Sequence, residues 1–163
     1  MARVLIVLTS HDRLGDTGRK TGFYFDEMAA PYWALRDAGH EVVLASIAGG
    51  EAPHDPTSLA DDPAERPAPV SRFLDDAAAM SALASTMALD DVDAADWDAI
   101  FVPGGHGTMW DVATSEPLAH AISAVYAAGG VVGAVCHGPA GLVGATKDGG
   151  RPLVEGLKVA TFT

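Results

Sequence analysis

The chain has 163 residues, of which 10 are basic and 22 acidic, so its formal net charge is −12 and its isoelectric point lies near 4.6. This length predicts a single domain over residues 1–163, and the 48% of hydrophobic residues exclude a disordered chain. The acidic balance argues against nucleic acid and anionic membranes as partners, because both bind basic surfaces.

The sequence pattern predicts neither a transmembrane helix nor a secretory signal peptide. No apolar run approaches the ~20 residues of a transmembrane helix, and the amino-terminal segment lacks the cleavage site of a signal peptide. The single cysteine, Cys136, excludes an intramolecular disulfide and fits a reducing compartment. We therefore expect a soluble cytoplasmic protein.

Strands and helices alternate along the predicted fold. Around residues 25–35, apolar residues at three- and four-residue spacing predict a helix that ends at Gly39, and Pro31 predicts a kink or a later start. A second amphipathic helix is predicted over 118–128. This alternation favours a doubly wound α/β fold with a mainly parallel sheet. Short apolar runs predict its strands at 3–8, 41–45, 99–102, 131–135 and 158–162.

Several loops interrupt this rhythm. The long segment 48–96 is rich in proline in its first half and contains a plausible helix over 73–87, so we expect an insertion or a cap over the pocket. In an open α/β sheet, ligands bind beyond the carboxyl ends of the strands. The loops 10–27, 103–111 and 136–141 should therefore meet around the site.

Cys136 is the principal candidate for chemistry. It follows the predicted strand 131–135 and precedes a predicted helix, a position that resembles the nucleophile elbow of hydrolases. The amino terminus of such a helix would lower the pKa of the thiol; the alternative is a buried cysteine that acts as a small hydrophobic residue. Its neighbour His137 is a candidate acid or base, or only a residue at the helix start.

The run 103–108 contains glycines that could bring a backbone N–H close to a ligand as an oxyanion donor, or could simply form a flexible turn. Glu27 lies in the first turn of the first helix, where acids commonly interact with the helix dipole. If that turn lies beside Cys136, the Glu27 carboxyl could hydrogen-bond to sulfur or exchange a proton with substrate. Trp110 and Tyr24 could line a pocket, or pack in the core.

No cofactor or metal is expected. The chain has neither a complete G-x-G-x-x-G after its first strand nor a Gly-Lys-Ser/Thr motif. Two acidic stretches, His54-Asp55 with Asp61-Asp62 and the aspartates of 90–96, lack the spacing of metal ligands. We interpret them as solvated faces.

Three motifs together resemble the ThiJ/PfpI superfamily, whose fold is flavodoxin-like, of the class I glutamine amidotransferase type, with helices on both faces of the sheet. The closer similarity is to its branch of chaperones and glutathione-independent glyoxalases (glyoxalase III), and it covers nearly the whole chain. The motifs are Gly-Gly-His-Gly at 104–107, Ala-Val-Cys-His-Gly-Pro-Ala at 134–140, and Thr21-Gly22 followed by Glu27.

The resemblance implies roles for particular residues. Cys136 would be the nucleophile, Glu27 its carboxyl partner and His137 the adjacent histidine, while the backbone N–H groups of Gly105 and His137 would hold the oxyanion. We assign His106, Tyr24 and Trp110 to the substrate pocket. The resemblance also implies a homodimer without a cofactor.

Members of the superfamily usually continue through further strands and a closing helix, and a partner for the histidine follows a Phe-Thr like Phe162-Thr163. The expectation is therefore a truncated or cleaved chain, or one completed by another polypeptide, with exposed apolar surface and a tendency to aggregate.

The function that this resemblance implies is a glyoxalase III-type lyase. It would convert 2-oxoaldehydes such as methylglyoxal to 2-hydroxy acids such as D-lactate through a thiohemiacetal on Cys136, and could also act as a deglycase. The alternatives are a holdase-type stress chaperone and a cysteine redox sensor with little turnover.

Overall fold

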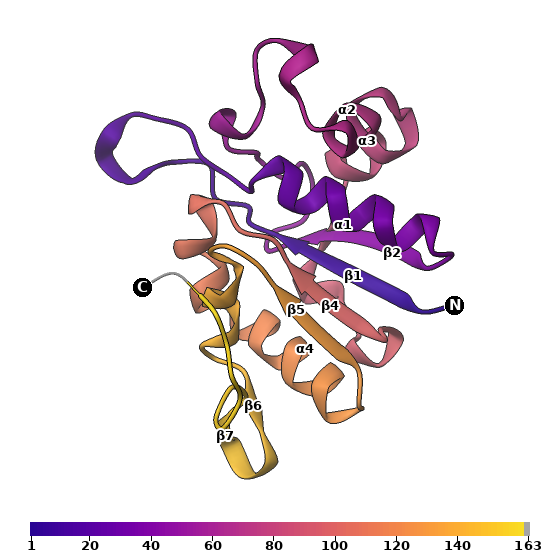
Figure 1. Ribbon diagram of the computed structural model, residues 1–163. Helices are drawn as coiled ribbons and strands as arrows, with labels where there is room; N and C mark the ends of the chain where they lie inside the picture. Colours follow the sequence, from indigo (N-terminus) through magenta and orange to yellow (C-terminus); the bar gives the residue numbers. More distant parts are fainter. Residues whose placement is uncertain (162–163) are drawn as a thin grey trace.

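A parallel five-stranded sheet forms the centre of the structure, a computed structural model that describes residues 1–161 (Figure 1). The strand order is β3-β2-β1-β4-β5, and every neighbouring pair in the sheet is parallel. The strands are β1 (Arg3–Leu8), β2 (Glu41–Ser46), β3 (Met87–Ala88), β4 (Ala99–Val102) and β5 (Val131–Ala134).

Helices cover both faces of this sheet (Figure 1). On one face lies α1 (Phe25–Asp37), with α2 (Ala68–Asp75) packed on it and α3 (Ala77–Ala84) packed on α2 and β2, and on the other lies α4 (Glu116–Ala127). Side chains of the central strand alternate between the two cores, because successive residues of a strand point to opposite faces. Leu5 and Val7 belong to the core with α4, whereas Ile6 and Leu8 belong to the core with α1.

The predicted doubly wound sheet is confirmed, and four of its predicted strands are observed within one residue. The strand predicted at 158–162 is wrong over 158–161, which form no strand, and Phe162 lies outside the described residues. A short antiparallel hairpin of β6 (Thr146–Lys147) and β7 (Arg151–Pro152) precedes this segment.

The helices also differ from the prediction in two places. The helix α1 runs through Pro31 without ending, because buried side chains on both sides of the proline, among them Met28 and Tyr32, anchor it to the sheet. The single helix predicted over 73–87 is two helices, α2 and α3. Asp76 separates them and caps α3 by accepting a hydrogen bond from the Ala79 N–H.

The order in which the strands are added to the sheet reverses between β1 and β4. From β1 the chain moves through β2 to β3 on one side, and then crosses to β4 and β5 on the other. Ligands of doubly wound sheets bind at such a reversal, beyond the carboxyl ends of the strands. The loops that follow β1, β4 and β5 meet there.

Candidate active site

Cys136 occupies a strained turn directly after β5. Its φ is 56°, and no other non-glycine residue within residues 1–161 has a positive φ. Such a conformation costs about 1–3 kcal/mol and is typical of functional sites. The turn leads into the 3-10 helix Gly138–Leu142, so the predicted elbow is observed but the predicted α-helix is a shorter 3-10 turn.

Burial and the neighbouring Glu27 carboxylate raise the pKa of the Cys136 thiol above its ordinary value. The thiol is hydrogen-bonded to the Glu27 side chain, whereas the backbone N–H groups of Gly105 and His137 donate toward sulfur and act in the opposite direction. The expected lowering of the pKa by a helix dipole is therefore wrong. A five-residue 3-10 turn has a small dipole, and the carboxylate opposes it.

The carboxyl group of Glu27 is held in place from the β4 loop. The Gly104 N–H donates a hydrogen bond of 2.8 Å to Glu27 Oε2, and the Tyr24 N–H donates one of 3.0 Å to the Gly104 carbonyl. These two bonds attach the start of α1 to the loop after β4. The carboxylate is thereby fixed on one side of Cys136.

Gly104 allows this close approach because it has no side chain. A Cβ at position 104 would lie 2.6 Å from Cys136 Cβ, 2.7 Å from the His137 N and 2.8 Å from Glu27 Oε2. All three distances are shorter than van der Waals contact. The glycine therefore lets Cys136, the His137 N–H and the Glu27 carboxylate converge.

We expect Gly104→Ala to separate these groups and to lower both activity and stability. Overpacking of this kind costs about 1–3 kcal/mol in the free energy of unfolding, which a urea titration would measure alongside turnover. Gly144→Ala is the matched control, since a Cβ there meets only the side chain of Ala119, at 3.0 Å. Wild-type turnover in Gly104→Ala would contradict the assigned role of this contact.

The titration of Cys136 gives a second test of the site. Because the Glu27 carboxylate helps to raise the pKa of the thiol, Glu27→Gln should lower that pKa, and alkylation by iodoacetamide should reach half its maximal rate at a lower pH. Intact mass measures this directly, because Cys136 is the single cysteine of the chain. Glu116→Gln, in the first turn of α4, is the control. If the pH of half-maximal alkylation is unchanged or higher in Glu27→Gln, the contact between Glu27 and the Cys136 thiol is refuted.

Two histidines lie on the other side of the thiol. His137 Nδ1 is 3.2 Å from Cys136 Sγ, and the His137 ring centroid is 5.0 Å from that of His106. His106 Nδ1 in turn lies 3.6 Å from Oδ2 of Asp55. The structure thus brings His106 to the site as expected, and adds Asp55. The prediction of a solvated face is wrong for Asp55, because its carboxylate is buried and hydrogen-bonded by Thr21 and Thr57.

Tyr24 and Trp110 do not pack in the core. Tyr24 precedes α1 with its side chain partly exposed, and Trp110 is 41% exposed. The Trp110 ring stacks on His11, with centroids 4.8 Å apart and planes 6° apart. Trp110 therefore braces the loop after β1, and its assignment to the substrate pocket stays a prediction.

A largely apolar cavity of about 530 Å³ opens beside Cys136. Cys136 and His137 form its polar end. Its apolar wall includes Met109, Leu142, Val143, Val154 and Val159. A small carbonyl compound could reach the thiol from this side.

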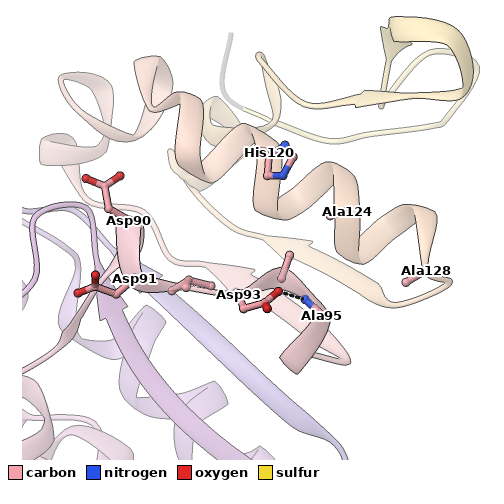
Figure 2. A pocket seen from close by; sticks show the side chains of 9 residues that line it. Asp90, Asp91, Asp93, Ala95, His120, Ala124 and Ala128 are labelled. Carbon is pink, nitrogen blue, oxygen red and sulfur yellow. Dashed lines mark hydrogen bonds between the residues drawn. The ribbon is translucent and has the colours of Figure 1, made fainter.

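The acidic stretch around residue 90 lines a separate cavity of about 600 Å³ against α4 (Figure 2). Asp93 caps a turn there by accepting a hydrogen bond from the Ala95 N–H, at 3.0 Å.

Nowhere in residues 1–161 do three His, Cys, Asp or Glu side chains gather in a way that could hold a metal ion. None of the helices over the same residues is long and apolar enough to span a membrane.

Comparisons with known proteins identify the family of the chain. The model of the DJ-1/PfpI family matches residues 21–153, a range that contains Glu27, Gly105 and Cys136. The chain is 37% identical to the glutathione-independent glyoxalase HSP31 of Saccharomyces cerevisiae over 99% of its own length and 68% of that protein. It is 34% identical to glyoxalase 3 of Candida albicans, covering 70% of it.

Solved structures give the same picture. The chain superimposes on glyoxalase III from Candida albicans with a TM-score of 0.83 at 32% identity, covering 94% of this chain and 64% of that one. For the rapid encystment protein REP24 of Francisella tularensis the TM-score is 0.87 at 36% identity, with 94% and 67% covered. The predicted flavodoxin-like fold is confirmed, and the chain spans about two thirds of the length of these relatives.

Proposed function

Because this chain belongs to the DJ-1/PfpI family, we propose that it converts 2-oxoaldehydes such as methylglyoxal to 2-hydroxy acids without glutathione. The observation that carries the proposal is the close approach of Cys136, the His137 N–H and the Glu27 carboxylate around Gly104, where an added Cβ would lie within 2.8 Å of all three. The names of the relatives, glutathione-independent glyoxalase and glyoxalase 3, support the same reaction.

In the first step, sulfur adds to the aldehyde carbon, C1, of the substrate. A thiol whose pKa is raised is a weak nucleophile until its proton leaves, and the hydrogen-bonded Glu27 carboxylate can accept that proton as the C–S bond forms. The aldehyde oxygen gains negative charge and is stabilised by the N–H groups of Gly105 and His137. Glu27 then returns the proton to this oxygen, giving a hemithioacetal.

The second step isomerises the hemithioacetal to a thioester. Glu27, or His137, removes the proton from C1, and the electron pair moves into a C1–C2 double bond of an enediolate. The same group returns the proton to C2, which becomes the alcohol carbon. The hydroxyl proton on C1 passes to the oxygen of C2, and C1 becomes the thioester carbonyl. The isomerisation moves hydrogen within the substrate and needs no external oxidant.

In the third step, water attacks the thioester carbonyl and the C–S bond breaks. His137 Nδ1, 3.2 Å from the sulfur, is placed to take a proton from the water. His137 then gives this proton to the leaving sulfur, and the products are the 2-hydroxy acid and the free Cys136 thiol. The same chemistry on early aldehyde adducts of proteins or nucleotides would make the protein a deglycase.

The proposal is tested by incubating the purified protein with methylglyoxal in the absence of glutathione and assaying both enantiomers of lactate. We expect one D-lactate for each methylglyoxal consumed, with a rate that added glutathione does not increase. Consumption of methylglyoxal without lactate would mean that the aldehyde only modifies surface lysines and arginines, and would refute the proposal.

A holdase activity is the second candidate, because large apolar side chains are exposed beside the cavity. Val143 is 77% exposed, and Met109, Leu157 and Val159 are also exposed. Surfaces of this kind bind unfolded chains without the thiol. Suppression of the aggregation of a heated client protein by Cys136→Ala as well as by the wild type, with no lactate formed by either, would favour this function. A redox sensor would instead gain oxygen on Cys136 at low peroxide.

A further inference from the structure

Asp55 is a buried carboxylate that the proposed reaction does not use. It lies between β2 and α2, and its side chain is only 6% exposed. Thr57 donates to Oδ1 through its N–H at 2.9 Å and its hydroxyl at 2.7 Å, and the Thr21 hydroxyl donates to Oδ2 at 2.9 Å. Burial by itself would raise the pKa of Asp55, but hydrogen bonds from Thr57 and Thr21 and the neighbouring His106 outweigh it and hold that pKa below its usual value.

The backbone around Asp55 fixes it against the active-site loops. The Phe23 N–H donates to the Pro53 carbonyl at 2.9 Å, and the Asp55 N–H donates to the Phe23 carbonyl at 2.8 Å. The Gly107 N–H, one residue after His106, donates to the Gly22 carbonyl at 3.3 Å. The 53–55 segment, the start of α1 and the loop after β4 are therefore one connected unit.

The buried anion faces His106, whose ring lies beside that of His137. His106 Nδ1 is 3.6 Å from Asp55 Oδ2, the His106 side chain is 57% exposed, and its ring is 5.0 Å from that of His137. His137 contacts the Cys136 sulfur. His106 therefore lies between the Asp55 carboxylate and the His137 ring. The Cys136 thiol is on the far side of His137.

We propose that His106 is a second proton-transfer group of this site and that Asp55 is its positioning residue, an inference that rests on the proposed function. An imidazole whose Nδ1–H faces a fixed carboxylate has its ring orientation set, and its other nitrogen, Nε2, is left to exchange a proton with the substrate. This is the arrangement in which a carboxylate orients a histidine for acid–base chemistry.

The step assigned to His106 concerns the oxygens, whereas Glu27 acts on the carbons. When Glu27 removes the C1 proton, protonated His106 gives its Nε2 proton to the C2 oxygen, and the product is a neutral enediol. When Glu27 returns its proton to C2, the hydroxyl on C1 gives its proton to His106 and becomes the thioester carbonyl. His106 and Glu27 are both restored, and no proton is gained or lost.

A purely structural role for Asp55 is the alternative, because its side chain also caps the short turn Pro56–Ser58. The two roles differ in what they would change. A cap affects folding and the reactivity of every group in the site, whereas a positioning residue acts only through His106. A double-mutant cycle separates them, since two residues that act through one group are not additive.

The experiment compares His106→Gln, Asp55→Asn and the double variant in lactate formation from methylglyoxal. We expect kcat to fall about 100-fold in His106→Gln and about 10-fold in Asp55→Asn, with KM little changed, as for loss of an acid–base group and of its orienting partner. The double variant should be no slower than His106→Gln alone. Alkylation of Cys136 by iodoacetamide should stay within about twofold of wild type in each variant, because the thiol and Glu27 are untouched.

Asp93→Asn is the matched control, since Asp93 caps a turn in the same way but precedes β4, at the opposite end of the sheet. Wild-type kcat in His106→Gln would overturn the proposal and leave the proposed function standing. A double variant slowed by the product of the two single effects would overturn the positioning role of Asp55. A wild-type protein that forms no lactate would overturn the proposed function and this inference with it.

Discussion

Cys136→Ser should abolish the formation of lactate from methylglyoxal. Serine keeps the shape of the side chain and its hydrogen bond to Glu27, but an alcohol is a far weaker nucleophile than a thiol and its oxyanion is a poorer leaving group. Removal of a nucleophile costs on the order of 10⁴-fold or more in kcat. The measurement is the initial rate at matched concentrations of folded protein, with near-ultraviolet circular dichroism as the check on folding.

The control for this variant is Ser123→Ala, which removes a hydroxyl on α4 that bonds to the Ala119 carbonyl and the Thr146 N–H, away from the thiol. It should retain wild-type turnover. Lactate formation by Cys136→Ser within tenfold of wild type would exclude covalent catalysis by this residue.

Glu27→Gln should produce the second-largest loss, about 10²- to 10³-fold in kcat, the usual effect of losing a general base. The amide can still accept the Gly104 N–H hydrogen bond, which in the wild type is 2.8 Å long. It cannot, however, accept the thiol proton or the C1 proton. The same change lowers the pKa of Cys136, so the thiol should alkylate faster near neutral pH while turnover collapses.

Faster alkylation of Cys136 together with a loss of turnover is the diagnostic result for Glu27→Gln. A variant that merely disorders the site would lose both alkylation selectivity and turnover, and Glu116→Gln should change neither. Slower alkylation in Glu27→Gln together with wild-type lactate formation would show that Glu27 is not the base.

The general arrangement of the site could be predicted from the sequence because it depends on strand ends. Strand 131–135 and strand 99–102 are short apolar runs, so the residues after them, Cys136 and Gly105, had to meet at one edge of a parallel sheet. The helix around residues 25–35 placed Glu27 at the same edge. The contacts between them required the backbone geometry, in particular the approach that Gly104 permits.

The parts that the sequence could not predict lack a periodic pattern. The strand β3 has two residues, too few for an alternation to be seen. Asp55 lies in an irregular segment, and what brings it to His106 is backbone pairing with Phe23. A local signal existed in the Asp-Pro-Thr sequence, which favours a capped turn, but it does not identify the histidine on the other side.

The direction of the pKa shift of Cys136 also had to come from the structure. The sequence predicts a helix start after the cysteine and hence a lowered pKa, whereas burial and the Glu27 carboxylate together raise it. A homodimer and a partner for His137 beyond Thr163 stay predictions of the family resemblance, and a cytoplasmic location stays a prediction from the sequence pattern. Sedimentation equilibrium would test the first.

The most direct test of covalent catalysis by Cys136 is a rapid-quench measurement of protein mass after mixing with methylglyoxal. We expect an adduct confined to Cys136 that forms before lactate appears and decays at the rate of lactate formation. In Glu27→Gln the adduct should persist, because its isomerisation is blocked. Lactate released while Cys136 remains unmodified throughout would contradict the account.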